Sequence, residues 1–405
     1  MAFLNVKSVE EVYKVINSFK VNPGEQIVDI VDAVGKTLAE DIYSPYDLPQ
    51  FNRSAVDGYA VRWEDVSGAS ESLPSLLEVI ERLEMGTAPT NELKPGSCVE
   101  VPTGGMLPKN ADSVVMVEYT ENFSDHEVGI HKSVASGENV IIKGEDIKKG
   151  EVIMNKGDQV LPESINLLSS LGVTKVSIVK PVRVGIISTG DELVETGEEW
   201  CLGEIPNSNG PGLMAACKLW GGIPEYYGIV KDQFNDVKST LKKAVNECEI
   251  VLLTGGTSVG KKDYVAEAIE SIGTPGVLIH GIALKPGKPT IIGQIDNTPV
   301  FGLSGNPVSA MLCFKLFVRP LLNNYTEEKT LIGYLNQNIP SAGGRQDYVP
   351  VKVNQVKDKI EVKPLFAKSN SIGVLTKMDG YIIVPIHSEG LAKGEKVKIY
   401  LKERG

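Results

Sequence analysis

Residues 250–272, IVLLTGGTSVGKKDYVAEAIESI, carry the pattern that decides the fold of this chain. An apolar run is followed by a glycine-rich segment and then by DYVAEAIESI, which has the apolar spacing of a helix. The same order recurs around it, with strands VRVGIIST, PEYYGIV, VLIHGIAL, TIIGQI and PVFGLS and helices SNGPGLMAACKLW, FNDVKSTLKKAVNEC and 308–322. Short apolar strands alternating with helices predict a three-layer αβα domain over residues 181–325, with a parallel-rich sheet covered on both faces.

The rest of the sequence predicts three further domains, and therefore a multidomain fold that combines α/β and β domains. Residues 51–141 contain alternating valines punctuated by Gly and Pro, which predicts a β-rich domain. Residues 1–50 and 142–180 have mixed character and predict one discontinuous N-terminal αβ domain. Period-2 alternation after 326, as in DYVPVKVNQVKDKIEVKPL, predicts a small β-barrel or a sandwich over 326–405, and the barrel is preferred.

The composition excludes several classes of function. The net charge of −11 argues against broad binding to nucleic acid or to an anionic membrane, because both need basic surfaces. The five cysteines and four histidines are scattered, which predicts reduced thiols and no zinc site. No segment approaches the ~20 apolar residues of a membrane helix. We therefore expect a cytoplasmic protein.

The glycine-rich segment resembles a P-loop in spacing but differs at a decisive position. Gly255, Gly260 and Lys261 have the G-x-x-x-x-G-K spacing, whereas Lys262 stands where a P-loop has the Ser or Thr that holds Mg²⁺. An NTPase is therefore disfavoured. Glycines and a helix N-terminus still suit an anion, and Asp263 can be either a helix N-cap or part of a site.

Polar residues follow several predicted strands at the same edge of the αβα sheet. In open α/β sheets, ligands bind at the carboxyl ends of the strands. The strand ends here carry Thr189, Gly190 and Glu192; Asp232; Thr254, Gly255 and Gly256; and Ser304, Gly305 and Asn306. Any one of these sets is typical of a plain turn. Four sets at one edge favour a binding site.

The segment LKPGKP, residues 284–289, carries two lysines around a turn. Pro286 and Gly287 suit the central positions of a type II turn, which places the Cα atoms of Lys285 and Lys288 less than ~7 Å apart. Two ammonium groups that close either point apart into solvent or share an anion. The position after a buried strand and the stiffening by Pro289 favour an oxyanion site over a solvated turn.

The segment GLSGNPVSA, residues 302–310, supports the same site. Asn306 and Pro307 suit the N-cap and the first position of a helix, so the N–H groups of Val308 and Ser309 would face the strand ends.

Two carboxylate segments lie outside this domain: VDGYA contains Asp57, and KGEDI contains Asp146. Together with Glu192, Asp232 and Asp263, these two carboxylates could bind Mg²⁺ or a basic heterocycle. Taken alone, each segment is typical of a surface turn.

Taken together, these segments resemble the molybdopterin molybdotransferases, the MoeA family that includes the E domain of gephyrin. NRSAVDGYA, PTGGMLP, GEDI, STGDEL, TGGTSVGKKDY, LKPGKP, GLSGNPVSA and GRQDYVPV occur in the order of that family, from about residue 5 to 400. The resemblance implies a four-domain homodimer whose active-site cleft forms where the protomers meet. It implies insertion of molybdate into adenylylated molybdopterin with Mg²⁺-dependent release of AMP, and an adenylyltransferase that supplies the substrate.

The resemblance also assigns roles to residues at matching positions. It implies an oxyanion set of Lys285, Lys288, Pro289, Ser309 and Arg345, completed by Ser369 or Ser371. It implies that Asp57, Asp146, Glu192 and Asp263 are catalytic, and that Asp57, Glu192 and Asp263 hold the metal. The pterin and nucleotide would contact the strand-end residues and Thr103.

Three positions depart from the family: Ser304 replaces a proline, Asn370 a glycine, and Lys143 a frequent arginine. Asn370 could alter the selectivity between similar oxyanions. Three alternatives remain open: a tungstate-inserting version of the enzyme, a molybdopterin adenylyltransferase, whose single domain resembles residues 181–325, and a non-catalytic scaffold. The extra domains and the KPGKP and DGYA motifs argue against the adenylyltransferase.

Overall fold

The structure is a computed structural model that describes residues 6–256, 264–322, 328–357, 359–366 and 370–402. The chain forms two compact units. Unit 1 contains residues 1–27, 35–37 and 177–405, and unit 2 contains residues 28–34 and 38–176. This division does not separate four domains, so the four predicted domain limits stay predictions.

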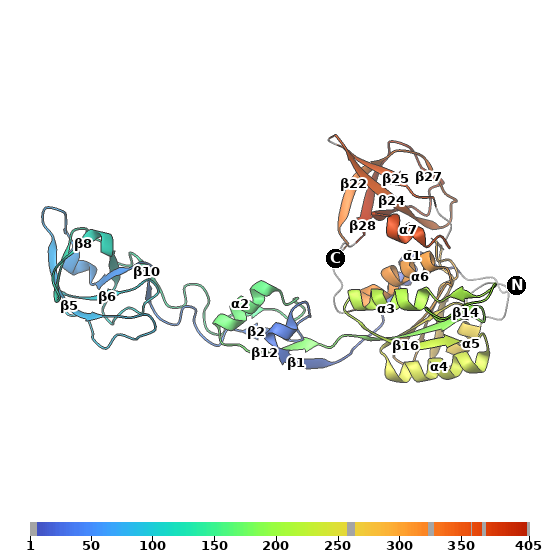
Figure 1. The fold of residues 1–405 in the computed structure, drawn as a ribbon, viewed down its shortest axis with the longest axis horizontal. Helices are drawn as coiled ribbons and strands as arrows, with labels where there is room; N and C mark the ends of the chain where they lie inside the picture. Colours follow the sequence, from blue (N-terminus) through green and yellow to red (C-terminus); the bar gives the residue numbers. More distant parts are fainter. Residues whose placement is uncertain (1–5, 257–263, 323–327, 358, 367–369, 403–405) are drawn as a thin grey trace. The chain divides into compact units, whose positions relative to one another are not determined.

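Unit 1 is built around a six-stranded sheet (Figure 1). The order of its strands is β16 (Ile223–Val230), β13 (Arg183–Thr189), β17 (Ile250–Thr254), β21 (Thr298–Leu303), β20 (Ile291–Ile295) and β18 (Pro275–His280). The first four strands are parallel, and β20 is antiparallel to both of its neighbours. All five residues of β17 are buried, as a central strand covered on both faces requires. The predicted parallel-rich sheet is confirmed.

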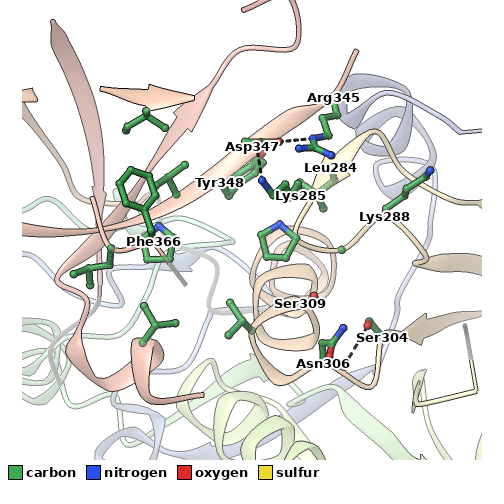
Figure 2. Close-up of a pocket in the computed structure, with 18 of the residues that line it drawn as sticks. Leu284, Lys285, Lys288, Ser304, Asn306, Ser309, Arg345, Asp347, Tyr348 and Phe366 are labelled. Carbon is green, nitrogen blue, oxygen red and sulfur yellow. Dashed lines mark hydrogen bonds and ion pairs between the residues drawn. The ribbon is translucent and has the colours of Figure 1, made fainter. Parts of the chain in front are cut away.

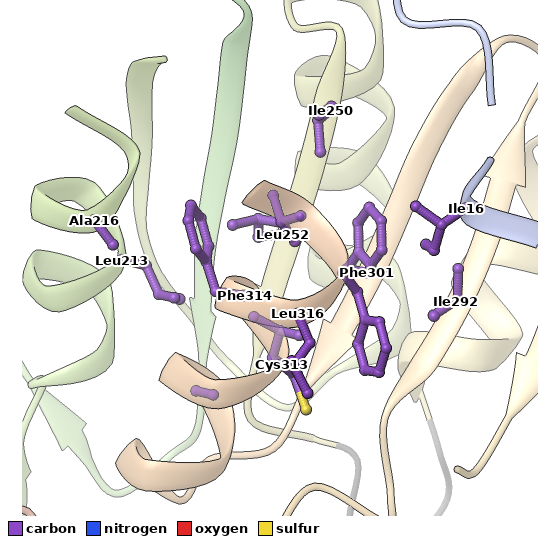
Figure 3. Packing of buried hydrophobic residues seen from close by; sticks show 14 of the residues in the cluster. Ile16, Leu213, Ala216, Ile250, Leu252, Ile292, Phe301, Cys313, Phe314 and Leu316 are labelled. Atoms are coloured by element: carbon purple, nitrogen blue, oxygen red, sulfur yellow. The ribbon is translucent and has the colours of Figure 1, made fainter. Parts of the chain in front are cut away.

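Helices cover both faces of this sheet and bury a separate apolar cluster on each. On one face, α1 (Val9–Ile16), α3 (Asn209–Leu219) and α6 (Pro307–Cys313) contribute to a cluster that includes Leu252 and Phe301 of the sheet (Figure 3). On the other face, α4 (Phe234–Glu247) and α5 (Tyr264–Ile272) pack against Val251 and Leu253. Because neighbouring residues of β17 point to opposite faces, one strand supplies both clusters. The αβα layering follows.

The N-terminal helix α1 packs into unit 1. Its N-terminus is closed by a capping box, in which Glu11 N–H donates to Ser8 Oγ at 3.2 Å and Ser8 N–H donates to Glu11 Oε2 at 2.8 Å. Val9, Val12 and Ile16 lie on its buried face, and the Tyr13 ring contacts the ring of Phe317 edge-on at 5.8 Å. Helix α1 therefore completes the core on the α3 and α6 face.

The predicted helix 308–322 is divided into three segments. Helix α6 spans Pro307–Cys313, a π-helical turn spans Phe314–Val318, and a 3₁₀ turn spans Arg319–Leu321. Pro320 has no N–H to donate, so a regular helical ladder cannot continue through it. The segment is helical in the predicted place, but the prediction of one continuous helix is wrong.

The C-terminal part of unit 1 is a closed barrel. Its strands are β24 (Gln346–Val356), β25 (Lys359–Pro364), β22 (Thr330–Leu335), β28 (Lys396–Leu401) and β26 (Gly380–Val384), and β26 pairs back onto β24. Alternate residues, among them Val351, Val362, Ile382 and Ile399, fill the interior. Smaller elements near it are β23 (Ile339–Pro340), β27 (Gly390–Leu391) and α7 (Gly373–Lys377). The predicted barrel is confirmed, and the sandwich is excluded.

Unit 2 is rich in β-structure. Its main sheet has the order β7 (Ser113–Met116), β4 (Gly58–Val61), β6 (Ser97–Val101), β5 (Ser75–Arg82), β9 (Glu127–Ile130) and β8 (Thr120–Ser124). Helix α2 (Pro162–Ser170) and the paired strands β2 (Ile42–Tyr43) with β11 (Val152–Met154) and β3 (Arg53–Ser54) with β10 (Val140–Ile141) complete it. Among the described residues, no helix has the length and apolarity that crossing a membrane requires.

Candidate active site

A short strand, β19 (Leu284–Lys285), fixes the first lysine of the LKPGKP segment against the barrel. It runs parallel to β24, so that Lys285 lies opposite Asp347. Gln346 N–H donates to the carbonyl oxygen of Ala283 at 2.9 Å and holds this register. The lysine segment and the GRQDYVPV segment, which are far apart in sequence, are thereby joined through their backbones.

Asp347 is the buried centre of a charged cluster. Its side chain is 4% exposed, whereas those of Lys285 and Arg345 are 56% and 38% exposed. One carboxylate oxygen, Oδ1, lies 2.9 Å from Arg345 Nε, and Oδ2 lies 3.4 Å from Lys285 Nζ (Figure 2). A buried carboxylate needs such partners, since isolated charges are costly to remove from water. Our sequence reasoning missed Asp347, although it quoted the GRQDYVPV segment that contains it.

The loop that carries the two lysines is closed at both ends. Ile282 N–H donates to Lys288 O at 2.9 Å, and Thr290 N–H donates to Gly287 O at 3.2 Å. The predicted type II turn around Pro286 and Gly287 stays a prediction. Figure 2 shows the Lys285 ammonium directed toward Asp347 and the Lys288 ammonium lying away from it.

Gly287 is required where this loop passes the core. Its φ is +119°, and a Cβ at this position would lie 2.6 Å from Cys313 Sγ. Cys313 is fully buried, and burial raises the pKa of its thiol to about 12. The loop therefore rests on a neutral thiol, with Thr290 Oγ1 3.2 Å from the sulfur.

Lys285, Lys288 and Arg345 line a cavity of about 650 Å³ that lies entirely within unit 1. Pro289, Ser304, Asn306, Ser309 and Asp347 also line it. Among the described residues, Lys288 forms no ion pair. The other wall is apolar and comes mainly from the barrel: Ile339, Pro340, Val349, Pro350, Leu365, Phe366 and Val374. The cavity thus has a cationic end, formed by Lys285, Lys288, Arg345 and Asp347, and an apolar wall.

Helix α6 begins at the cavity with Pro307 in its first position, as predicted. Asn306 occupies the N-cap position, but its side chain makes no capping hydrogen bond. The Asn306 N–H donates to Ser304 Oγ at 3.3 Å. Ser309 is 2% exposed, and both Val308 and Ser309 line the cavity.

Beside this helix, the carboxyl ends of three strands come together. We call Thr189, Asn209, Thr254, Gly255 and Gly305 the strand-end group. Asn209 Nδ2 donates to Thr254 Oγ1 at 2.7 Å and to the carbonyl oxygen of Gly305 at 2.9 Å, which ties the end of β17 to the segment after β21. Asn209 was missed in the sequence, because the first residue of a helix carries no signal beyond its turn propensity.

Thr189 ends β13 with an unpaired hydroxyl. The residue is 2% exposed, and its Oγ1 has no hydrogen-bond partner among the described residues. Gly255, with φ of +104°, passes so close that a Cβ there would lie 2.0 Å from the Thr189 carbonyl oxygen. Gly256 is also adjacent, because a Cβ there would lie 3.0 Å from Thr189 Oγ1. Buried polar groups are normally paired, so this hydroxyl is a candidate ligand contact.

Two acidic residues of unit 1, Glu192 and Asp232, follow the ends of β13 and β16. Glu192 is exposed after Gly190, and the backbone N–H of Asp232 donates to Asp191 Oδ1 at 3.2 Å. No group of three or more His, Cys, Asp or Glu side chains able to hold a metal ion occurs in the described part of the chain. Asp263, a predicted metal ligand, lies outside the described residues, as does Ser369. The residues described here therefore do not by themselves fit Mg²⁺.

Asp57, Thr103 and Asp146 belong to unit 2. Asp57 Oδ1 accepts a hydrogen bond from Thr103 N–H at 2.7 Å, and this bond, with a second from the Thr103 side chain, lowers the pKa of the Asp57 carboxyl. Asp146 is exposed, and its backbone N–H donates to the carbonyl oxygen of Leu48. In unit 1, Ser371 is exposed before α7 and is not among the described residues that line the cavity.

An αβα domain with polar strand ends and a cationic cavity against a barrel defines a multidomain protein that combines α/β and β domains. Three family models match successive parts of the chain: the MoeA N-terminal region (domain I and II) over residues 7–172, a probable molybdopterin binding domain over 185–324, and the MoeA C-terminal region (domain IV) over 333–402.

Relatives match along nearly the whole length. A protein of Methanocaldococcus jannaschii named for molybdopterin biosynthesis is 40% identical, with 98% of this chain and 97% of that protein covered. The molybdopterin molybdenumtransferase of Bacillus subtilis is 31% identical, with 97% and 93% covered. The crystal structure of a molybdopterin biosynthesis MoeA protein from Pyrococcus horikosii has a TM-score of 0.88 at 37% identity, with 98% and 99% covered. The chain belongs to the molybdopterin molybdenumtransferase family and is a transferase of molybdenum cofactor biosynthesis.

Proposed function

We propose that this chain inserts molybdate into adenylylated molybdopterin and releases AMP, as the last general step of molybdenum cofactor biosynthesis. The observation that carries the proposal is the cationic end of the cavity. Three cations, less the one carboxylate of Asp347, leave a net charge of +2. That charge matches a tetrahedral dianion such as molybdate, and the lysine and arginine side chains offer only hydrogen-bond donors.

The chemistry proposed for these residues is mainly localisation. Lys285, Lys288 and Arg345 bind the oxyanion, and Ser309 adds a hydroxyl at the buried side of the cavity. Pro289 and Ser371 complete the proposed oxyanion set, together with Ser369. Holding the dianion beside the substrate's dithiolene sulfurs converts an encounter between two anions into a reaction within one complex, which is where the rate gain arises. The apolar wall keeps water away from that meeting point.

The strand-end group is proposed to hold the pterin and its phosphate. Thr189 offers a buried hydroxyl, and Gly255 lets the backbone after β17 pass close to Thr189. Gly190, Asp232, Gly256, Ser304 and Asn306 belong to the same proposed contact surface, and Thr103 of unit 2 is proposed to contact the pterin or nucleotide. A bound Mg²⁺ would neutralise charge on the phosphate anhydride. The carboxylates proposed for it are Asp57, Glu192 and Asp263, with Asp146 as a further catalytic residue.

The proposal includes the assembly and its surroundings. A homodimer is part of it, as is an adenylyltransferase that hands over the adenylylated substrate. A cytoplasmic location is supported by the five unpaired cysteines, four of which are buried.

The test is to incubate the purified chain with adenylylated molybdopterin and Mg²⁺, with molybdate, tungstate or neither, and to measure AMP and metallated pterin. Release of AMP that depends on molybdate supports the proposal. Equal release with tungstate alone would assign the tungstate version. AMP formation without either oxyanion, or consumption of ATP with apo-molybdopterin as in an adenylyltransferase, would contradict it. An inactive protein that still dimerises would favour the scaffold.

A further inference from the structure

The role of Asp347 is not explained by the binding of an oxyanion. A carboxylate repels a dianion, yet this one lines the same cavity as three cations and is 3% exposed. Both of its oxygens are turned to cations, Oδ1 to Arg345 Nε and Oδ2 to Lys285 Nζ. The carboxylate therefore presents its charge to the protein's own cations and not to the cavity.

The geometry of these contacts leaves the useful donors of both cations available. Arg345 approaches Asp347 through Nε, and its two terminal nitrogens, Nη1 and Nη2, make no hydrogen bond with a described residue. Those two nitrogens form the fork that suits an oxyanion. Lys285 keeps further N–H donors, since an ammonium group has three. Its side chain is 56% exposed, and the residue lines the cavity.

The backbone explains why Asp347 can act as a fixed reference for the two cations. Lys285 and Asp347 are register partners in the parallel pairing of β19 with β24, and Arg345 lies two residues before Asp347, just ahead of β24. Asp347 precedes Tyr348, which is buried in the core that α1, α6 and the barrel share. Lysine and arginine side chains lose rotamer entropy when they are fixed, so a buried anchor that pre-orders them favours binding.

We propose that Asp347 is a positioning residue for the transfer reaction: it orients Lys285 and Arg345 so that their free donors converge on one oxyanion. This inference rests on the oxyanion part of the proposed function. It assigns to Asp347 no contact with the substrate, because its two oxygens are occupied by the cations.

Charge alone and positioning predict opposite results for Asp347→Asn. The substitution removes a negative charge and raises the net charge of the cationic end from +2 to +3. If only charge mattered, the variant would bind molybdate more tightly, because attraction between charges strengthens. If Asp347 positions the donors, the variant binds molybdate roughly tenfold or more weakly, since misplaced groups lose the benefit of orientation.

The experiment measures the dissociation constant of molybdate by calorimetry for the wild type and for Asp347→Asn, Asp347→Glu and Asp379→Asn. Asp347→Glu keeps the charge but displaces the carboxylate by one methylene, so it is expected to weaken binding as well. Asp379→Asn is the matched control. Asp379 is a barrel carboxylate 3.1 Å from Lys352 Nζ and accepts the Val353 N–H at 3.0 Å, but it does not line the cavity. Asp379→Asn should lower the melting temperature of the protein without changing the dissociation constant of molybdate.

Turnover of the same proteins separates positioning from a general loss of structure. Asp347→Asn is expected to raise the KM for molybdate about tenfold while the KM for adenylylated molybdopterin changes less than about twofold. Molybdate binding that is unchanged or tighter in Asp347→Asn would overturn the inference, as would an equal loss in Asp379→Asn. Should Asp347→Asn not fold, Asp347→Glu decides by the same measurement. A wild type that binds no molybdate would instead overturn the proposed function.

Discussion

The cationic end of the cavity and the strand-end group lie in the same unit, but they meet the cost of polar burial in opposite ways. At the cationic end, the buried carboxylate of Asp347 is paired with Lys285 and Arg345. In the strand-end group, Asn209 pairs with Thr254 and Gly305, but the buried Thr189 Oγ1 has no partner among the described residues. In the first region the buried carboxylate is paired without a ligand while the cations keep a net charge of +2, and in the second region a buried hydroxyl is left for a ligand to satisfy.

This difference matters for how each region would bind. A region whose groups are already held in place pays little ordering entropy when an anion arrives, which is the advantage of preorganisation. A region with an unpaired buried hydroxyl carries a penalty of about 1–3 kcal/mol that a ligand can remove. We therefore expect variants at the cationic end to lose function through misplaced charge, and variants in the strand-end group to separate affinity from stability.

The largest effect is expected from Lys285→Ala combined with Lys288→Ala. Each lysine can contribute a charge-assisted hydrogen bond of about 1.5–3 kcal/mol, so molybdate-dependent release of AMP should fall by roughly 10²–10⁴-fold. The measurement is the rate of AMP release at saturating pterin and varied molybdate.

The matched control is Lys352→Ala combined with Lys363→Ala, which removes two lysines of the barrel that do not line the cavity. This control should retain activity within about twofold, as is usual for surface changes. Unchanged AMP release in the Lys285 and Lys288 double variant would contradict the assignment of an oxyanion site to the cationic end of the cavity.

A smaller loss, about 100-fold in AMP release, is expected for Asp57→Asn in unit 2, if this carboxylate acts on the anhydride. Asp57 is held ionised by the Thr103 N–H, which lowers its pKa. Molybdate binding should stay within twofold of wild type, because Asp57 does not line the cavity. A parallel loss of molybdate binding would count against a role in the chemical step.

The lowered pKa of Asp57 also predicts how the stability of the protein depends on pH. The pKa of Asp57 is lower in the folded protein than in the unfolded chain, so its stabilising contribution is present above the ordinary value of about 3.9 and is lost as pH falls through the folded value. At neutral pH the free energy of unfolding of Asp57→Asn should therefore be lower than that of the wild type. This difference should become smaller below about pH 4. Asp47→Asn is the control: Asp47 accepts the Lys149 N–H at 2.9 Å and also has a lowered pKa, but it is not a predicted site residue. The free energy of unfolding of Asp47→Asn should show the same dependence on acid pH, whereas its rate of AMP release should equal that of the wild type.

Local pattern was enough to predict most of the fold. The apolar run of β17 and the glycines after it predict strand, loop and helix, and the αβα layering follows from how such units bury apolar faces. The division of the last helix into α6, a π-helical turn and a 3₁₀ turn was not predicted, although Pro320 is a local signal that a regular helix ends there. Local pattern could not predict how the lysine loop packs, since Gly287 meets Cys313 of the helix only in the folded chain.

The candidate site was predicted only in part. Lys285, Lys288 and Ser309 were found because their segments stand beside predicted strand ends, and the structure places them around one cavity. Asp347 and Asn209 were missed, because their importance lies in pairings with residues far away in sequence. The resemblance to a family supplied Arg345, which no local pattern singled out.

Gly255→Ala is expected to have the next largest effect. The new Cβ would lie 2.0 Å from the Thr189 carbonyl oxygen, at a φ of +104° that favours glycine. The free energy of unfolding should fall by about 1–3 kcal/mol, and affinity for adenylylated molybdopterin by roughly tenfold or more. Both are measured by thermal unfolding and ligand titration. Gly212→Ala is the control, since Gly212 lies in α3 outside the strand-end group and its Cβ would be at an ordinary contact distance of 3.5 Å from the nearest atom, Met311 Cε. Equal results for the two variants would show that close approach at Gly255 is unimportant.

The smallest effect, and the sharpest test of the comparison, is expected for Thr189→Val. Valine has the shape of threonine without the hydroxyl, so the change removes a buried group that has no partner among the described residues. The free energy of unfolding should stay the same or rise by up to about 1 kcal/mol, because no native hydrogen bond is lost. Affinity for adenylylated molybdopterin should fall by up to about tenfold, the worth of one neutral hydrogen bond.

Thr290→Val should show the opposite pattern. The Thr290 hydroxyl is buried and donates to the carbonyl oxygen of Gly287 at 2.7 Å, so Thr290→Val loses this native hydrogen bond and lowers the free energy of unfolding by about 1 kcal/mol. Two buried threonines of one unit would then respond in opposite directions, because one hydroxyl serves the fold and the other awaits a ligand. If Thr189→Val destabilises the protein as much as Thr290→Val and leaves pterin affinity unchanged, the Thr189 hydroxyl is structural and the contrast between the two regions is lost.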